Sequence, residues 1–356
     1  MELNNEQLEI VKATEPYVVV NASAAAGQTQ TLTERVRYLS TLDIPKEEIV
    51  VITFTNAAAE EMIERLGKDG YGIFIGTIHS YANYLLLASG YDTSKILNEE
   101  NFDELFNKVK KHINCIKPVE HLLLDEAQDT GELEWTFIFD MIKPNNYMLF
   151  ADHKQSIYRW KGAHPELLIN LSKKDYVKTY PLYHNYRNGR NILNFAKRII
   201  DKLGPDYKDN SIFASGREGK VFELEMNNEF ILGAIKESIE KKHYYNDWFI
   251  LCRTNDQVNI MYEYLKENNI PCDTFKRADL SNKQLNKKMN DNTVKVLTMH
   301  AAKGLEAKYV VAIGQKFYNE EERCISYVAA TRAKDLLIWI KTPKKKKKKV
   351  ETVNWE

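Results

Sequence analysis

The sequence predicts an α/β protein of two domains, each built on a parallel sheet with crossover helices. Short β-branched runs alternate with amphipathic helical stretches along the chain, which is typical of parallel sheets. The 356 residues suffice for two domains of ordinary size, and 44% of them are apolar, enough to fill two buried cores. Lys+Arg and Asp+Glu number 50 each, so net charge indicates no class of partner.

Two series of buried strands are expected. The first comprises Tyr17–Val20, Ile49–Phe54, Ile73–Thr77, His121–Leu124 and Tyr147–Ala151. The second comprises Val177–Leu182, Val221–Glu225, Trp248–Cys252, Val294–Met299, Tyr309–Ile313 and Leu336–Lys341. The helix-like segment Leu167–Lys174 lies between the series and is expected to cross over. These runs predict a first domain over residues 1–178 and a second over 179–342.

Other segments do not fit a sheet core. Tyr81–Pro118 is rich in Leu, Asn and Lys and predicts a small helical insertion in the first domain, and Lys276–Asn292 predicts a loop or short helices. The tail from residue 343 to 356 contains a block of like charges, Lys344–Lys349, which predicts disorder.

Cysteine usage and hydropathy predict a protein of a reducing, intracellular compartment. The four cysteines form no C-x-x-C pair, which argues against a disulfide framework or a zinc site. No signal-peptide core opens the chain, and no apolar run approaches the roughly 20 residues that a membrane helix needs. We therefore expect a cytoplasmic protein with no membrane contact.

A degenerate phosphate-binding loop follows the first strand. Residues 22–29 read A-S-A-A-A-G-Q-T and precede a helix-like segment, which is the context that G-x-x-x-x-G-K-[ST] requires. Such a loop aims backbone N–H groups and a helix N-terminus at phosphate oxygens, and its lysine adds a charge near the terminal phosphates. Gly27 and the hydroxyl of Thr29, a ligand for Mg²⁺, are present, but Gln28 stands where the lysine belongs.

A pair of carboxylates follows a second buried strand. Residues 122–129 read L-L-L-D-E-A-Q-D, so Asp125 is placed to contact a nucleotide-bound Mg²⁺ and Glu126 to activate water. Asp-Glu pairs after strands also cap helices, and this string alone does not exclude that interpretation. The next strand leads into A-D-H-K-Q-S-I-Y-R-W-K-G-A at 151–163, which combines Gln155 with aromatic and cationic side chains suited to stacking on single-stranded bases.

At this point the chain resembles the UvrD/Rep/PcrA family of superfamily 1 DNA helicases over nearly its whole length. Further ordered motifs carry the resemblance: L-N-N-E-Q at 3–7, V-I-T-F-T-N-A-A-A at 51–59, I-G-T-I-H-S at 75–80, L-Y-H-N-Y-R-N at 182–188, T-M-H-A-A-K-G-L-E at 298–306 and E-E-R-C-I-S-Y-V-A-A-T-R-A at 321–333. The resemblance implies two RecA-like domains of the P-loop NTPase type, with ATP and Mg²⁺ as cofactors.

The resemblance also implies residue roles. Gln7 would read adenine, Tyr186 would stack on it, and Glu306 would accept from the ribose, beside Gly304 of the same motif. Gln155 would contact the γ-phosphate, and Arg187 and Arg332 would act as arginine fingers. The matched DNA-contact positions are Phe54, Thr55, Asn56, Thr77, His79, Tyr158, Trp160, Thr298 and His300. Taken singly, Phe54 or Trp160 is as typical of a core as of a contact. Arginines in general often form surface salt bridges, but the motif context favours the finger role for Arg187 and Arg332.

The sequence departs from the family pattern in three places. Gln28, Ser23 and Ala25 replace the lysine and two common glycines of the loop, so activity is expected to be impaired. A recent or deliberate change is favoured over an ancient loss, because the carboxylates and both arginines are intact. The inserts are reduced, which predicts a minimal motor, and the lysine tail is compatible with nucleic-acid binding, a nuclear-import signal or a solvated end.

The sequence therefore predicts an ATP-dependent single-stranded DNA translocase or helicase, 3′-to-5′ and monomeric, acting on single strands or junctions. It is expected to come from a phage, a virus or an AT-rich bacterium and to be cytoplasmic, either nucleoid-associated or phage/viral, with a nuclear location left open by the lysine tail. Its expected protein partners act in replication, repair or defence. The alternative is an ATPase-dead DNA-binding homologue or a subunit of a larger complex. No residue excludes RNA as the substrate.

Overall fold

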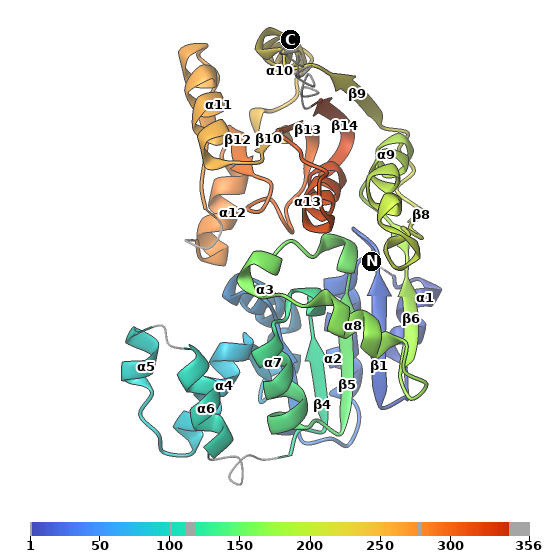
Figure 1. Ribbon diagram of the computed structural model, residues 1–356, viewed down its shortest axis with the longest axis vertical. Coiled ribbons are helices and arrows are strands. Elements are labelled where there is room, and N and C mark those ends of the chain that lie inside the picture. Colours follow the sequence, from blue (N-terminus) through green and yellow to red (C-terminus); the bar gives the residue numbers. More distant parts are fainter. Residues whose placement is uncertain (1, 100–101, 112–117, 277–279, 342–356) are drawn as a thin grey trace, which may run out of the picture.

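The computed structural model describes residues 2–99, 102–111, 118–276 and 280–341. Two stacked halves make up the molecule, each with a six-stranded sheet (Figure 1). Every pairing within the two sheets is parallel, as the sequence predicts, and the α/β fold of two RecA-like domains is confirmed. None of the helices among these residues is long and apolar enough to cross a membrane.

The first sheet has the strand order β3-β2-β4-β5-β1-β6. Its strands are β1 (Tyr17–Ala22), β2 (Ile49–Ile52), β3 (Phe74–Gly76), β4 (His121–Leu124), β5 (Asn146–Ala151) and β6 (Lys178–Leu182). One face is covered by α1 (Asn5–Val11), α2 (Gln28–Leu39) and α3 (Asn56–Leu66). The other face is covered by α4 (Ile78–Ala88), α6 (Phe102–Lys111), α7 (Glu132–Thr136) and α8 (Pro165–Ser172).

One strand assignment was wrong. The segment Val177–Leu182 was predicted to open the second series, but β6 pairs with β1 in the first sheet, with Ala22 opposite Leu182. The boundary expected near residue 178 therefore falls where β6 begins, and the first sheet continues to residue 182. The physical reason is that the helix before it, α8, returns the chain to the edge of the same sheet rather than leading it into the second half.

The second sheet has the strand order β11-β12-β10-β13-β14-β9. Its strands are β9 (Lys220–Leu224), β10 (Trp248–Cys252), β11 (Cys272–Asp273), β12 (Val294–Thr298), β13 (Ala307–Ile313) and β14 (Ala333–Ile340). Its helices are α9 (Arg190–Ile200), α10 (Asn228–Glu240), α11 (Asn255–Glu267), α12 (Asn282–Asn290) and α13 (Glu320–Thr331). A two-stranded ladder, β7 (His184–Asn185) with β8 (Ile212–Phe213), lies beside α9 and was not predicted.

The helical insertion expected over 81–118 is represented by α4, α5 (Ser94–Asn98) and α6, while residues 112–117 lie outside the described chain. The segment 276–292 contributes α12, apart from 277–279, which are not described. The lysine tail also lies outside the described residues. Cys252, Cys272 and Cys324 are free thiols, and Cys115 falls outside the description.

The carboxyl ends of the first sheet define where chemistry can occur. Ile52 pairs with both Gly76 and Leu124, and Leu124 pairs with Leu149, so these strands end at one edge. That edge faces the second half (Figure 1), and the loops after β1, β2, β3, β4 and β5 therefore meet there. In open α/β sheets ligands bind at this position.

Candidate nucleotide and single-strand site

The phosphate loop lies between β1 and α2, in the predicted strand–loop–helix context. Ala25 adopts a left-handed φ of 58°, a conformation that favours glycine, and Gly27 has a φ of 81°. Gln7 reaches the loop from α1, donating from Nε2 to the carbonyl of Ala26 at 3.4 Å. A Cβ on Gly27 would lie 2.6 Å from that Nε2, so the glycine leaves room for Gln7.

Gln28 opens α2 and bonds to the first carboxylate. Its Nε2 donates to Oδ1 of Asp125 at 2.5 Å. Asp125 is 6% exposed, and burial together with neighbouring Glu126 raises the pKa of Asp125. A neutral amide therefore stands beside Asp125 where a lysine would supply positive charge.

Glu126 contacts groups from both halves. It has a left-handed φ of 52°, and its side chain is 33% exposed, so the carboxylate opens onto the cleft. Gln128 donates from Nε2 to its Oε2, and Lys303 Nζ lies 3.2 Å from the same oxygen. Burial alone would raise the pKa of Glu126, but Lys303, Gln128 and Arg332 outweigh it and hold that pKa below its usual range.

Arg332 crosses from the second half to Gln155 in the first. Its Nη2 donates to Oε1 of Gln155 at 2.8 Å, and its Nε donates to the carbonyl of Val328 at 3.0 Å. The guanidinium is 2% exposed; burial, and then the nearby Arg187, lowers the pKa of Arg332 to about 9. One proposed finger thus already contacts the glutamine proposed to touch the γ-phosphate.

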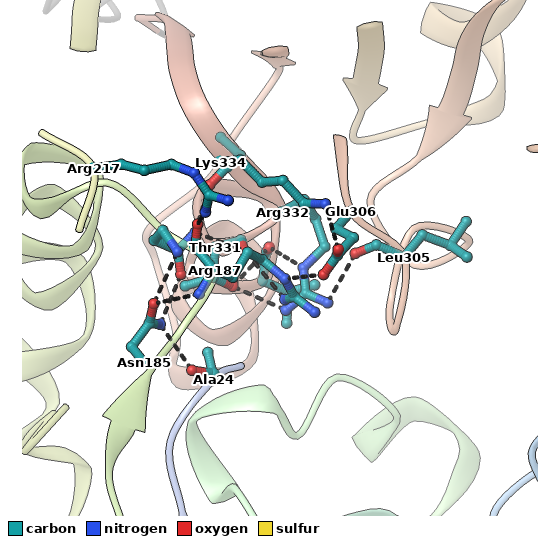
Figure 2. A network of polar contacts seen from close by, with 12 residues as sticks. Ala24, Asn185, Arg187, Arg217, Leu305, Glu306, Thr331, Arg332 and Lys334 are labelled. Atoms are coloured by element: carbon teal, nitrogen blue, oxygen red, sulfur yellow. Dashed lines mark hydrogen bonds and ion pairs between the residues drawn. The ribbon is translucent and has the colours of Figure 1, made fainter. Parts of the chain in front are cut away.

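Arg187 and Glu306 pair with each other (Figure 2). Arg187 Nε lies 2.5 Å from Glu306 Oε2, and Lys334 Nζ lies 2.5 Å from Oε1. Although burial opposes it, Arg187 and Lys334 lower the pKa of Glu306 to about 2. A ribose hydroxyl at Glu306 would compete with these ion pairs. Gly304 turns the chain just before, with a φ of 80°.

The segment after β6 docks onto the phosphate loop. Asn185 donates from Nδ2 to the carbonyl of Ala24 at 2.8 Å, as Figure 2 shows, and the N–H of Tyr186 donates to the carbonyl of Ala25 at 3.2 Å. The hydroxyl of Tyr186 accepts from Nδ2 of Asn4 at 2.6 Å. Tyr186 is therefore beside α1 and the loop, where an adenine read by Gln7 would lie.

Three residues of this cluster were missed by sequence reasoning: Lys303, Asp129 and Gln128. Lys303 Nζ forms an ion pair with Asp129 Oδ2 and donates to the carbonyl of Gln155 at 3.0 Å. Gln128 accepts at Oε1 from the N–H of Asp152 at 3.0 Å. All three stand inside motifs quoted above, which is the only signal the sequence offers, because no spacing shows that Lys303 and Asp129 meet across 174 positions.

Several of the predicted DNA-contact residues line one groove of about 780 Å³, which also reaches Asp125 and Glu126. They are Phe54, Thr55, Thr77, His79 and Tyr158. The rings of Phe54 and Tyr158 stack with centroids 5.0 Å apart and an interplanar angle of 22°. Phe54 is 36% exposed, so this aromatic pair presents a face to solvent.

The threonines of the groove have a structural role as well. Thr55 and Thr77 are the N-caps of α3 and α4, accepting from the N–H groups of Ala58 and Ser80. His79 lies 3.8 Å from Glu134, and burial lowers the pKa of His79. Because both capping threonines line the groove, α3 and α4 begin at it. The N–H groups in the first turn of each helix that the caps leave without a partner favour phosphate there.

The remaining predicted contacts lie outside that lining. Asn56 is exposed at the start of α3, and Trp160 is 65% exposed. The ring centroid of His300 lies 6.2 Å from that of Tyr158 and 6.4 Å from that of Trp160, and Thr298 accepts at Oγ1 from the N–H of Ala301. Burial, with Arg253 adding to it, lowers the pKa of His300 to about 4.

Comparison with known proteins agrees with this architecture. The model of the UvrD/REP helicase N-terminal domain matches residues 3–117 and 95–176, and that of the UvrD-like helicase C-terminal domain matches 180–280 and 273–344. The chain belongs to the UvrD-like helicase family. The family assignment made from the motifs is therefore confirmed.

Relatives in this family include two proteins named ATP-dependent DNA helicase PcrA. The one from Staphylococcus aureus is 26% identical over 76% of this chain and 50% of its own length, and the one from Leuconostoc citreum is 26% identical over 76% and 49%. The DNA helicase II of Haemophilus influenzae is 27% identical over 76% and 50%. The chain spans about half the length of the curated relatives it matches.

Proposed function

We propose that this UvrD-like chain binds ATP in the cleft between its halves and single-stranded DNA in the groove beside it. Hydrolysis would drive 3′-to-5′ translocation, weakened in this chain by Gln28. The observation that carries the proposal is the 2.8 Å bond between Arg332 and Gln155. It brings a cation of the second half to the edge of the first sheet where the carboxylates lie, which supports a mechanism in which cleft closure accompanies hydrolysis.

Residues of the cleft can carry out the roles that phosphoryl transfer requires. Glu126, whose pKa lies below its usual range, is ionised and can orient and deprotonate a water against the γ-phosphate. Arg332 and Arg187 stabilise the charge that develops on the leaving phosphates. Arg187 must first exchange its ion pair with Glu306 for phosphate, and Glu306 is then free to accept from the ribose.

The donors beside the loop fit a magnesium ion. Asp125 and the hydroxyl of Thr29 are hard oxygen ligands, and Gln28, adjacent to Thr29, contacts Asp125. Among the described residues no group of three or more His, Cys, Asp or Glu forms a metal centre, so phosphate oxygens and water would complete the coordination. When bound, the ion neutralises phosphate charge. For Asp125 to hold the ion through Oδ1, Gln28 would have to give up its hydrogen bond to that oxygen.

The neutral amide of Gln28 explains why weak activity is proposed. A lysine here would add a charge-assisted bond to the terminal phosphates in a partly dry site, which is worth roughly 2 to 4 kcal/mol of transition-state stabilisation. Left-handed Ala25 also places a Cβ on a loop whose backbone must approach phosphate closely.

The test compares DNA-dependent ATP turnover by the chain as it stands and by Gln28→Lys. Restoring the lysine is expected to raise DNA-stimulated turnover by about 30- to 1000-fold, the rate equivalent of the energy above. Gln30→Lys, which adds the same charge two residues along α2, is the matched control and should leave turnover low. Background turnover by Gln28→Lys on DNA and RNA strands alike would refute the motor.

A second candidate is an ATPase-dead homologue that binds DNA by itself or within a repair or defence complex. The Gln28–Asp125 bond favours this candidate, because it occupies an oxygen of Asp125 that a nucleotide-bound Mg²⁺ would otherwise use. ATP-independent binding of oligo(dT), with no turnover by either chain, would support this candidate.

A further inference from the structure

Lys303 is a buried cation of the second half that contacts several groups of the first half. It lies in the turn between β12 and β13 and reaches into the first half with a side chain that is 8% exposed. Its Nζ contacts Asp129, Glu126 and the carbonyl of Gln155. Asp129 is fully buried, so this ion pair is shielded from solvent and salt.

The same ammonium also faces the aromatic pair of the groove. Nζ of Lys303 lies 5.4 Å from the ring centroid of Tyr158, within cation–π distance, and Tyr158 stacks on Phe54. A base inserted between two stacked rings must separate them. The amino group of Lys303 thus contacts both Tyr158 in the groove and Glu126, the carboxylate proposed to act at the γ-phosphate.

We propose that Lys303 is a positioning residue that couples occupancy of the Phe54–Tyr158 pair by a nucleic-acid base to the position of Glu126. The proposal rests on the function proposed above and deepens it. A base that displaces Tyr158 removes one partner of the ammonium and shifts Nζ among its remaining partners. Glu126 then moves with Lys303 or gains a free oxygen for water. Because linkage is reciprocal, a change at Glu126 must alter DNA affinity through the same lysine.

The experiment is a double-mutant cycle read out as the affinity for fluorescent oligo(dT), with no nucleotide present. Glu126→Gln is introduced into the parent chain and into Lys303→Met. Removing an acidic charge beside the groove is expected to strengthen oligo(dT) binding in both backgrounds. The gain in affinity should be at least about fivefold greater in the parent chain than in Lys303→Met. Glu132→Gln, an acidic residue lining the same groove, is the control and should act equally in both backgrounds.

Three further variants separate coupling from folding and from cation–π stacking alone. Lys303→Met leaves Asp129 buried without its cation, so the cycle is repeated with Asp129→Asn present, and Lys303→Arg should retain the coupling. With Gln28→Lys, Lys303→Met is expected to lower maximal DNA stimulation of turnover. Lys161→Met, which also loses a cation 5.5 Å from the Tyr158 ring, should instead raise the DNA concentration needed for half-maximal stimulation.

The outcomes are distinguishable. If the parent chain binds oligo(dT) and the effect of Glu126→Gln is the same within about twofold with and without Lys303, the coupling role is overturned while the proposed function stands. If the folded parent chain does not bind oligo(dT), the proposed DNA function fails, and the role of Lys303 fails with it.

Discussion

Replacing Ala25 tests the geometry of the phosphate loop, because Ala25 is the non-glycine residue of the loop with a left-handed backbone. Its φ of 58° places an alanine Cβ in the left-handed region, which costs about 1 to 2 kcal/mol. Replacing it with glycine removes that strain but adds about 0.5 to 1 kcal/mol of backbone entropy lost on folding. The net expectation for Ala25→Gly is a protein as stable as the parent, or more stable by about 1 kcal/mol.

Ala24 is the matched control in the same loop. It is fully buried, has no positive φ, and its methyl group packs within the core of the second half. Ala24→Gly therefore adds the same entropy cost and also loses one buried methyl, about 0.8 kcal/mol, with no strain to relieve. It is expected to destabilise by about 1.5 kcal/mol, so the two variants should differ by about 2 kcal/mol.

Urea unfolding of the three chains measures this difference. With a slope of about 2 kcal/mol per molar urea, the midpoints of Ala25→Gly and Ala24→Gly should lie about 1 M apart. Equal midpoints for the two variants, or a larger loss for Ala25→Gly, would refute the left-handed assignment. With Gln28→Lys also present, Ala25→Gly is further expected to tighten nucleotide binding, because the loop loses a Cβ beside the phosphates.

Further predictions concern the Phe54–Tyr158 pair and the partly buried His300. Phe54→Ala is expected to weaken oligo(dT) binding by roughly 5- to 150-fold, the value of one stacked base, whereas Leu133→Ala, an exposed apolar residue of the same groove, should change it less than about threefold in the same anisotropy titration. Burial lowers the pKa of His300 from 6.5 to about 4. As the pH falls through that window the unfolded chain takes up a proton that the folded chain does not, so stability should fall by roughly 2 to 3 kcal/mol. His300→Gln should remove this part of the loss between pH 7 and pH 4, measured by urea midpoints, and an unchanged pH dependence would contradict it.

Much of the fold follows from local pattern. The predicted bounds of His121–Leu124 and Trp248–Cys252 agree with β4 and β10, because β10 is an uninterrupted buried apolar run and β4 is one from Leu122 onward. The short strands β7, β8 and β11 have only two residues each and carry no such pattern. β6 was assigned to the wrong half, because its residues K-T-Y-P-L do not show which sheet edge they join.

The candidate site shows the same division. Local motifs identified Asp125, Glu126 and the loop, since each follows a strand directly and chain connectivity alone places it at the sheet edge. The roles of these residues stay predictions. What each side chain contacts was not readable from the motifs: the sequence placed Arg187 on phosphate and Glu306 on ribose, whereas in the structure these two residues form an ion pair.

The sequence by itself determined the family, the parallel α/β architecture and the absence of the loop lysine, because these depend on residue identity and order. Only the tertiary structure decided that Gln28 bonds to Asp125, that Ala25 is left-handed, and that Lys303 joins Glu126 to Tyr158. Lys303 meets Glu126 across 177 positions, and that contact depends on how the two sheets stack, whereas Gln28 meets Asp125 at the edge of the first sheet alone. No periodicity within either segment encodes that stacking.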